Sequence, residues 1–410
     1  MKIEQAVILC GGLGSRLGDL TAQTPKPLLP VAGAPFLEAL VREISRYGVK
    51  RFLLLAAYRS DQIERFARET PARLGRDDLT ISVSIEPDQA GTGGALFHAR
   101  DALDDAFYLF NGDTLLDTRL PELSRLLDDP DAVGVLALRP LPEAGRYGVT
   151  VLDGERITHF GVRSDAPGPV LINGGVAAFR KSFVDRLSPQ GSFEADVLPA
   201  LAQEGRLRGL ATDGYFIDIG VPEDYARAQT EVPDFQRRPA LFLDRDGVLN
   251  QDHGHVGSID RFDWIDGARE AVALANRAGW YVFVVTNQAG IGKGLYSHDD
   301  YVAVMDHIRA GLSERGAWID DVRFCPDHPE ATVEAHRRIT DWRKPGPGML
   351  HDLMRCWPVD AGRSLMIGDR ETDRLAASAA GVASALFTGG RLDDFLRNQP
   401  QFAAPTEGIA

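Results

Sequence analysis

The sequence contains few cysteines, no long apolar run and no excess of positive charge. The chain has three cysteines among 410 residues. An odd number this small cannot form a disulfide framework, and it fits a reducing cytoplasm. No segment approaches the roughly 20 consecutive apolar residues of a membrane-spanning helix. The formal net charge of −14 gives no global positive field that would attract nucleic acid or anionic lipid. We therefore expect a cytoplasmic protein that binds neither nucleic acid nor membranes.

The composition is that of a folded, globular chain. Hydrophobic residues make up 44% and charged residues 25% of the sequence, the usual mixture for globular domains. With 42 Gly and 24 Pro, glycine and proline are too few for a low-complexity chain. At about 150 residues per domain, the length predicts two or three domains.

The clearest domain boundary precedes the apolar run ALFLD at residues 240–244. The segment TEVPDFQRRP, residues 230–239, has two prolines, mixed charges and little apolar periodicity, which indicates an exposed linker. This predicts one domain over residues 1–229 and a second over residues 240–400.

Short apolar runs alternate with helical patterns in both halves of the chain. The runs lie at residues 6–10, 52–57, 81–85, 107–110, 240–244, 281–287 and 364–369. Helical patterns such as residues 35–48 and 268–279 separate them. Runs that are apolar on both faces and joined by helices are typical of parallel sheets covered by helix layers. We therefore predict the α/β class, with two Rossmann-like three-layer α/β/α domains in tandem.

A glycine-rich turn follows the first predicted strand. Gly11, Gly12 and Gly14 would let backbone N–H groups approach a phosphate closely. Arg16 and Lys26 would add positive charge beside a triphosphate. An ordinary turn with surface cations is the alternative, because short motifs often match by chance. The pattern is neither the Walker sequence, which needs Gly-Lys-Ser/Thr, nor the dinucleotide-binding fingerprint, whose third glycine is missing.

Two aspartates in the first half suggest a metal site. Asp113 follows the run at residues 107–110, at the strand end where open α/β sheets bind ligands. Asp218 stands in a similar apolar context. Two carboxylates together with phosphate oxygens suit Mg²⁺, although each aspartate alone could equally be a turn former or a helix cap. The sequence GTGG at residues 91–94 offers a second loop that allows close approach.

Together these motifs resemble the sugar-1-phosphate nucleotidyltransferases over roughly residues 4–230. GGLGSRL followed by TPKPLLPV is the specific part, and GTGGAL, NGDTLLD, INGGVAAF and DIGVPEDY follow in the family's order. The resemblance implies a nucleoside triphosphate held by Gly11, Gly12, Gly14, Arg16 and Lys26, with catalytic roles for the two cations. It implies Mg²⁺ held by Asp113 and Asp218. It implies further substrate-binding residues at Gly93, Asn111, Gly148, Asn173 and Glu194.

One segment departs from this family's pattern. Where many members have Glu-Lys-Pro, this chain has Gly161-Val162-Arg163. Arg163 is a candidate replacement for the lysine that holds the sugar phosphate, but the usual sugar-contacting glutamate is absent. The identity of the sugar therefore stays open.

The second half carries a different series of motifs. Asp244 and Asp246 follow a predicted strand, and two such carboxylates can divide labour, one attacking phosphorus and the other protonating the leaving oxygen. Thr286 ends the next predicted strand, Lys344 lies in a loop, and Asp369 ends a further strand with Asp373 beyond it. Asp-x-Asp alone could be a turn. The whole series in this order indicates phosphoryl transfer.

This half resembles the haloacid dehalogenase superfamily of phosphohydrolases over roughly residues 240–390, and within it the D-glycero-D-manno-heptose 1,7-bisphosphate 7-phosphatases. LFLDRDGVLNQDHGHV, VVTNQAGIGKG, CPDHPEATVE and DWRKPGPGML carry the resemblance. It implies that Asp244 is the nucleophile and Asp246 the acid/base, and that Thr286, Asn287 and Lys344 bind the transferring phosphoryl group. It also implies Mg²⁺ held by Asp244, Asp246 and Asp369, and sugar or phosphate contacts from Arg343 and Arg370.

The zinc loop of that family is altered here. The family reads Cys-x-His and later Cys-x-Cys, whereas this chain has Cys325-Pro326-Asp327 and Thr340-Asp341-Trp342. Structural zinc needs four ligands in a closed shell, and one of the four positions survives. His328 and His336 lie nearby in the sequence, but a zinc site of one Cys, one Asp and two His would not be the ligand set of that family. We expect structural zinc to be absent and Trp342 to pack the loop.

These resemblances predict a bifunctional enzyme of nucleotide-activated heptose synthesis. The phosphatase would remove the 7-phosphate of heptose 1,7-bisphosphate, and the transferase would join heptose 1-phosphate to a nucleoside triphosphate, GTP by resemblance, with release of pyrophosphate. One alternative is a mannose-type transferase fused to a generic sugar or histidinol phosphatase. Another is a regulatory first half that binds a sugar nucleotide without turnover. The sequence gives no indication of the oligomeric state.

Overall fold

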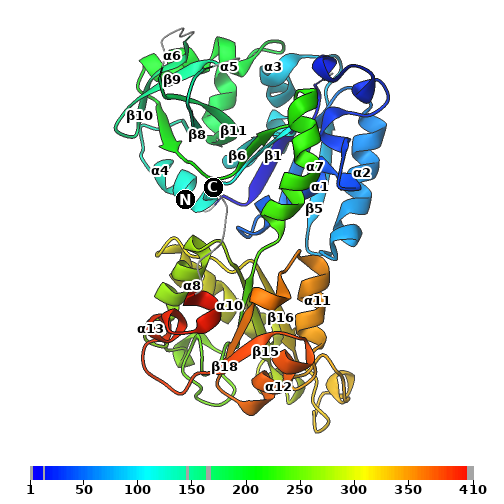
Figure 1. The fold of residues 1–410 in the computed structure, drawn as a ribbon, viewed down its shortest axis with the longest axis vertical. Helices are drawn as coiled ribbons and strands as arrows, with labels where there is room; N and C mark the ends of the chain where they lie inside the picture. The colour runs from blue at the N-terminus through cyan, green and yellow to red at the C-terminus, as the bar shows by residue number, and fades with distance from the viewer. Residues whose placement is uncertain (1–2, 13, 145–146, 163–167, 404–410) are drawn as a thin grey trace. The chain divides into compact units, whose positions relative to one another are not determined.

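The computed structural model describes residues 3–12, 14–144, 147–162 and 168–403. The chain divides into two compact units. Unit 1 comprises residues 1–45 and 49–236, and unit 2 comprises residues 46–48 and 237–410. Both combine a central sheet with covering helices (Figure 1), so the prediction of two α/β domains in tandem is confirmed.

Unit 1 is built on a sheet of nine strands. Their order is β5 (Thr80–Ile85), β4 (Arg51–Ala56), β1 (Gln5–Leu9), β6 (Ala106–Asn111), β11 (Val170–Arg180), β8 (Gly134–Leu141), β12 (Leu207–Ala211), β10 (Arg156–Val162) and β9 (Val149–Asp153). The first four are parallel, but β11 runs antiparallel to β6 and β8. The prediction of a wholly parallel sheet is therefore wrong for unit 1. The central residues of β11 are buried like those of a parallel strand, so their apolar pattern does not reveal strand direction.

Helices cover both faces of this sheet. They are α1 (Phe36–Ser45), α2 (Ser60–Leu74), α3 (Gly91–His98), α4 (Leu120–Leu126), α5 (Phe193–Asp196), α6 (Leu198–Gln203) and α7 (Pro222–Gln236). On one face, Phe107 and Leu109 of β6 pack with Leu96 of α3 and Leu201 of α6. A short pair of strands, β7 (Thr114–Leu116) and β13 (Phe216–Asp218), stands apart from the main sheet.

Helix α7 contains most of the segment that the sequence predicts to be a linker. Val232 and Phe235 lie three residues apart, so they share one face of the helix. Both are buried in a cluster that includes Phe36. The linker prediction for residues 230–239 is therefore wrong for the part that α7 contains, because this apolar pair buries its surface within unit 1.

Unit 2 has a five-stranded sheet that is parallel throughout. The order is β16 (Asp321–Cys325), β15 (Tyr281–Asn287), β14 (Ala240–Leu243), β17 (Leu365–Gly368) and β18 (Ala383–Leu386). The helices are α8 (Ala268–Arg277), α9 (Ala289–Gly292), α10 (His298–Ser313), α11 (Gly348–Cys356), α12 (Glu371–Ala379), α13 (Leu392–Arg397) and α14 (Pro400–Ala403).

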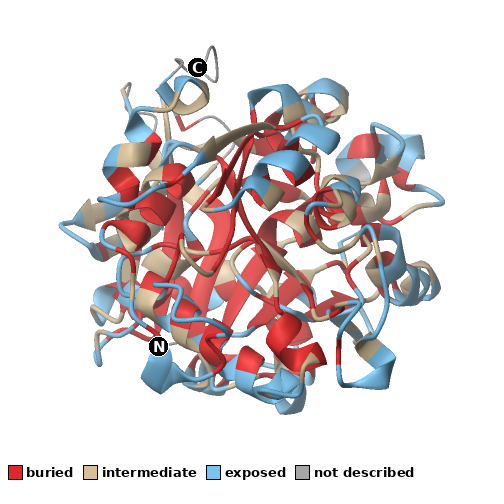
Figure 2. Cartoon of the chain, turned by 90° about the horizontal axis from the view of Figure 1, so that it is seen from below, coloured by how far each residue is buried: buried red, intermediate tan, exposed pale blue. Residues whose placement is uncertain are grey.

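Successive side chains along the strands of unit 2 point to opposite faces of the sheet and pack into two separate hydrophobic cores. Leu241 and Leu243 pack on the side of α8 and α10, and Phe242 packs on the side of α11 and α12. Buried positions accordingly follow the strands and the inner faces of the helices (Figure 2). In the described part of the chain, no helix combines the length and apolarity that a membrane span requires.

Candidate active sites

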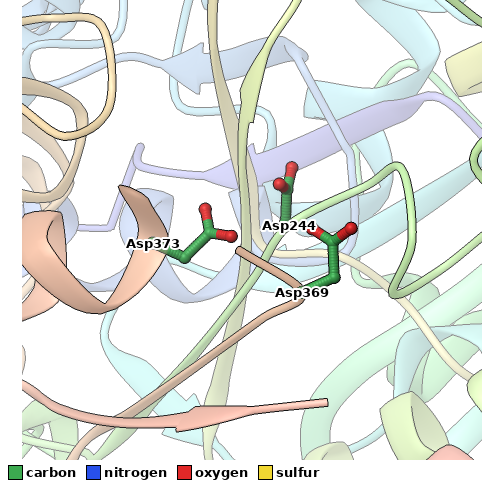
Figure 3. Close-up of side chains that lie close together, drawn as sticks. All are labelled: Asp244, Asp369 and Asp373. Carbon is green, nitrogen blue, oxygen red and sulfur yellow. The ribbon is translucent and has the colours of Figure 1, made fainter. Parts of the chain in front are cut away.

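Three carboxylates come together where two parallel strands of unit 2 end. Asp244 follows β14, Asp369 follows β17, and Asp373 lies in the first turn of α12, where its Oδ2 accepts a hydrogen bond from the backbone N–H of Arg370 at 3.0 Å. One oxygen of each aspartate lies within 4.8 Å of the others (Figure 3). The Oδ1 atom of Asp369 is buried and has no hydrogen-bond partner among the described residues. This donor set suits a hard divalent cation.

Lys344 supplies a cation to the same cluster. Its ammonium lies 2.8 Å from Asp244 Oδ2 and 2.6 Å from Asp373 Oδ1, and it donates to the backbone carbonyl of Val285 at 2.8 Å. Burial raises the pKa of Asp244 to about 6, although Lys344 acts in the opposite direction. Burial alone would lower the pKa of Lys344, but Asp244 and Asp373 hold it above its ordinary value.

The second aspartate of the Asp-x-Asp motif lies in a hydrogen-bond network instead. Asp246 accepts from Arg245 at 2.8 Å, from Asn250 at 3.0 Å and from Gln288 at 3.0 Å. Gln288 Nε2 also donates to Thr286 Oγ1 at 2.9 Å. The carboxylate of Asp246 is thus not part of the three-aspartate group, whose third member is Asp373. Asp246 is instead linked to the hydroxyl of Thr286.

The other predicted residues of unit 2 surround this centre. Asn287 is paired with the backbone of Lys344, donating to its carbonyl at 3.0 Å and accepting from its N–H at 3.1 Å. Arg343 is half-buried and donates to the backbone carbonyl of Asp327 at 3.3 Å. Arg370 is largely exposed and is 2.5 Å from Asp252. Arg370 therefore pairs with the side chain of Asp252, whereas Arg343 is held by a backbone carbonyl.

In unit 1 the glycine-rich turn leaves β1 at its carboxyl end. A Cβ atom on Gly11 would lie 2.8 Å from Glu86 Oε1, whereas one on Gly12 would meet open space. Gly14 has a positive φ of 65°, which favours glycine. Arg16 is exposed in the 3-10 helix η1 (Ser15–Thr21). The turn is therefore open on the side that Gly12 faces.

The two predicted metal ligands of unit 1 occupy neighbouring positions. Asp218 belongs to β13 and pairs with Thr114, the residue after Asp113. The ammonium of Lys26 lies 2.5 Å from Asp113 Oδ2. Asp218 Oδ1 accepts from the N–H of Gly220 at 2.8 Å, and its Oδ2 accepts from the hydroxyl of Tyr147 at 3.2 Å. Two carboxylates and one cation thus meet at the β7–β13 pair.

A cavity of about 400 Å³ opens beside Asp218. Its walls include the four predicted residues Asn111, Gly148, Asn173 and Glu194, and also Thr114, Tyr147, Phe160, Gly161, Gly175, Ser192, Ala195 and Phe216. Glu194 accepts hydrogen bonds from Thr92 at 2.6 Å and from Ser192 at 2.9 Å. Arg163 lies outside the described residues. The volume and the polar walls suit a phosphorylated sugar.

The GTGG sequence forms the start of α3 rather than a loop. A Cβ on Gly91 would lie 2.5 Å from the carbonyl oxygen of Gly191, and one on Gly94 would lie 2.6 Å from that of Pro189. The N–H of Gly93 donates to Gly191 at 2.9 Å. The predicted close approach therefore exists, but what approaches α3 here is the chain's own backbone.

Three residues that take part in these sites are absent from the sequence-based set. They are Glu86 beside Gly11, Tyr147 on Asp218, and Gln288 between Asp246 and Thr286. Tyr147 directly precedes the predicted Gly148, and Gln288 directly follows the predicted Asn287, which was a usable signal. Glu86 lies near Gly11 because β5 and β1 belong to one sheet with β4 between them, and the apolar runs of the sequence do not give this strand order.

Family models match both units. The nucleotidyl transferase model matches residues 5–234, more than half of the chain. The HAD-hydrolase-like model matches residues 341–407. The fold and the clustered carboxylates therefore belong to a chain of two enzyme domains.

Individual proteins are similar to one part of the chain or another. A D-glycero-beta-D-manno-heptose-1,7-bisphosphate 7-phosphatase of Rhodopseudomonas palustris is 48% identical over 161 residues, covering 39% of this chain and 89% of that protein. A D-glycero-alpha-D-manno-heptose-1,7-bisphosphate 7-phosphatase of Burkholderia mallei is 45% identical over 147 residues, covering 36% of this chain and 78% of that protein. The crystal structure of HddC from Yersinia pseudotuberculosis complexed with GMP-PN has a TM-score of 0.48 and 29% identity, covering 55% of this chain and 98% of that one.

The chain belongs to the nucleotidyl transferase family over its first half. Over its second half it belongs to the family of the heptose-bisphosphate 7-phosphatases. It is a bifunctional enzyme, a nucleotidyltransferase and a phosphomonoesterase in one polypeptide. Both predicted resemblances and the predicted enzyme classes are confirmed.

Proposed function

We propose that this enzyme carries out two successive steps in the synthesis of a nucleotide-activated heptose. Unit 2 removes the 7-phosphate of D-glycero-D-manno-heptose 1,7-bisphosphate. Unit 1 then transfers a nucleotidyl group, GMP from GTP, to heptose 1-phosphate and releases pyrophosphate. Because the first step leaves the 1-phosphate that the second step needs, the order of the chemistry supports the pairing. A reaction that consumes a nucleoside triphosphate also fits the cytoplasm.

The observation that carries the phosphatase step is the placement of Lys344 between Asp244 and Asp373. Asp244 attacks the phosphorus atom through a carboxylate oxygen, and the bond from phosphorus to the sugar oxygen breaks. Asp246 gives that oxygen its proton. Thr286 and Asn287 bind the phosphoryl oxygens, while Lys344 neutralises their charge. Water then hydrolyses the aspartyl phosphate and frees Asp244.

Mg²⁺ fits the three-aspartate group of unit 2. Asp244, Asp369 and Asp373 would hold it there, Asp369 directly through its unpartnered oxygen. When bound, Mg²⁺ lowers the cost of bringing a phosphate dianion against carboxylates.

In unit 1 the sugar phosphate is the nucleophile. Its oxygen attacks the α-phosphorus of the nucleoside triphosphate, and pyrophosphate leaves. Gly11, Gly12, Gly14, Arg16 and Lys26 bind the triphosphate. The sugar occupies the cavity lined by Asn111, Gly148, Asn173 and Glu194, while Gly93 supports that wall from α3. Asp113 and Asp218 would hold a second Mg²⁺, which supplies charge neutralisation at the reacting phosphates.

The test is a substrate panel with separate readouts of phosphate and pyrophosphate. Heptose 1,7-bisphosphate with Mg²⁺ is incubated with GTP, ATP, CTP or UTP in turn. We expect phosphate release in every tube and pyrophosphate release with GTP above all. Activity with mannose 1-phosphate and histidinol phosphate but not with the heptoses would favour the mannose-type alternative. Phosphate release without pyrophosphate from any nucleotide would favour a regulatory first half.

A further inference from the structure

The loop that follows β16 does not fit the zinc ion that clamps it in the resembled family. The four ligand positions are occupied by Cys325, Asp327, Thr340 and Trp342. The indole N–H of Trp342 donates to the carbonyl of Phe324 at 2.9 Å, and this nitrogen has no lone pair to offer a metal. Thr340 Oγ1 accepts from the backbone N–H of Trp342 at 3.1 Å. Because structural zinc needs a closed four-ligand shell, the loop must be held in another way.

Asp327 lies at the centre of the contacts that hold the loop. Its side chain is 4% exposed, and its two oxygens accept from His336 Nδ1 at 2.9 Å and from Arg338 Nε at 2.6 Å. Burial alone would raise the pKa of Asp327, but Arg338 and His336 hold it below its ordinary value. A buried carboxylate is stable only with such partners. We call these three residues the ion-pair clasp.

The backbone around the clasp is closed and packed. The N–H of His328 donates to the carbonyl of His336 at 3.0 Å, and the N–H of Val333 donates to that of Gly292 at 2.9 Å. A Cβ on Gly292 would lie 2.4 Å from the carbonyl oxygen of Pro326. The loop therefore folds on itself and lies directly on α9, the helix that follows β15 and its phosphoryl-binding residues.

The clasp is connected to the reaction centre through Arg343. The guanidinium of Arg343 donates to the backbone carbonyl of Asp327 at 3.3 Å, and burial lowers its pKa. Among the described residues no carboxylate pairs with it. The next residue, Lys344, contacts the nucleophile Asp244 at 2.8 Å. A shift of Asp327 would therefore move Arg343, the residue that directly precedes Lys344 in the chain.

We propose that Asp327 is a positioning residue of the phosphatase, and that the ion-pair clasp replaces the structural zinc of the resembled family. The clasp fixes Arg343 so that its guanidinium meets the part of the substrate that does not react. This inference rests on the proposed function, since it assigns Arg343 to the heptose bisphosphate.

Asp327→Asn tests the inference, because the amide keeps the shape but loses the charge and one acceptor. The assays use heptose 1,7-bisphosphate and p-nitrophenyl phosphate, which has the phosphate but not the sugar. We expect KM for the bisphosphate to rise about tenfold or more, the cost of one lost hydrogen bond to a charged group. We expect kcat and the reaction of p-nitrophenyl phosphate to change little. Equal losses for both substrates, or an unchanged KM, would overturn the proposal.

A matched control and a second readout separate positioning from general damage. Glu334→Gln makes the same chemical change at an exposed position of the same loop and should behave as the native chain. Tryptic cleavage after Arg337, Arg338 or Arg343 should be faster in Asp327→Asn than in Glu334→Gln, and equal rates count against the clasp. If the native chain hydrolyses p-nitrophenyl phosphate but not the bisphosphate, the proposed substrate fails, whereas the proteolysis still tests the clasp.

Restoring the four zinc ligands by substitution tests whether the ion-pair clasp replaces the zinc ion. The triple variant Asp327→His, Thr340→Cys and Trp342→Cys, together with Cys325, has the complete ligand set. We expect about one zinc per chain in this variant and close to none in the native chain by elemental analysis. Chelation followed by Mg²⁺ replenishment should open the loop to trypsin in the variant alone. One zinc bound per native chain would overturn the proposal.

Discussion

The ammonium of Lys344 lies 2.8 Å from a carboxylate oxygen of Asp244, and both side chains are buried. Two buried charges of opposite sign stabilise each other only when they are close and well oriented. Here Asp373 contacts the same ammonium at 2.6 Å, and its carboxylate lies close to that of Asp244, so negative charge exceeds positive charge. That imbalance is a reason for a divalent cation at this site.

Asp244→Asn should stop phosphate release and leave the transferase nearly intact. The amide is a far weaker nucleophile than the carboxylate, so we expect kcat of the phosphatase to fall on the order of 10⁴-fold. Pyrophosphate release from heptose 1-phosphate and GTP should be almost unchanged, since unit 1 has its own sheet and core. Asp260→Asn, an exposed carboxylate of unit 2, serves as the matched control. A parallel fall of both activities would argue against independent sites.

The phosphatase should lose affinity for Mg²⁺ in acid. Burial raises the pKa of Asp244 to about 6, and only the ionised carboxylate can attack phosphorus or help to bind the metal. As the pH falls through about 6, protons and Mg²⁺ compete for this group. The Mg²⁺ concentration for half-maximal activity should rise about tenfold per pH unit below that point, as for one competing proton. Metal titrations of the rate between pH 5 and pH 8 would measure it, and a constant half-maximal concentration would contradict it.

The reciprocal prediction concerns the β7–β13 pair of unit 1. Asp113→Ala and Asp218→Ala should each lower nucleotidyl transfer by several orders of magnitude, because that chemistry depends on charge neutralisation and positioning. Phosphate release should continue at the native rate. Asp77→Ala, an exposed position of unit 1, controls for the loss of a carboxylate. Near-normal transfer in either variant would rule out a metal site built on both aspartates.

The sequence predicted the strands better than their directions. The apolar runs at residues 52–57, 107–110 and 281–287 correspond to β4, β6 and β15, because buried strands need continuous apolar residues. The same pattern cannot distinguish parallel from antiparallel pairing, as β11 demonstrates. Direction is fixed by chain connections and by neighbours that are remote in the sequence.

The candidate site residues also include some that the sequence predicts and some that it does not. The motifs predicted that Asp244, Lys344 and Asp369 would lie close together, and the structure places them so, while their catalytic roles stay predictions. The clasp of Asp327 could not, since it joins residues whose pairing depends on the path of one loop. The linker prediction failed for a related reason, because the burial of Val232 and Phe235 outweighed the prolines and charges around them.

The phosphatase should remove the 7-phosphate and leave the anomeric 1-phosphate untouched. The unit 2 strands are joined by helices and loops with no second sheet among the described residues, so selection falls to the loops near Asp244. One of them is held by the contact between Arg370 and Asp252, and the other carries Arg343. An exposed primary phosphate can enter such a site in line with Asp244, whereas a ring-attached phosphate would press the sugar against both loops.

The preference for the 7-phosphate over the 1-phosphate requires only a modest difference in free energy. A preference of about 100-fold corresponds to about 2.7 kcal/mol of transition-state binding, which one or two misplaced charged hydrogen bonds can supply. Unit 1 depends on this preference, because loss of the 1-phosphate would remove its nucleophile. Phosphorus NMR of the reaction with heptose 1,7-bisphosphate should show the primary phosphate signal disappear while the anomeric signal persists. If the anomeric signal disappeared first, both the selectivity and the two-step sequence that depends on it would have to be abandoned.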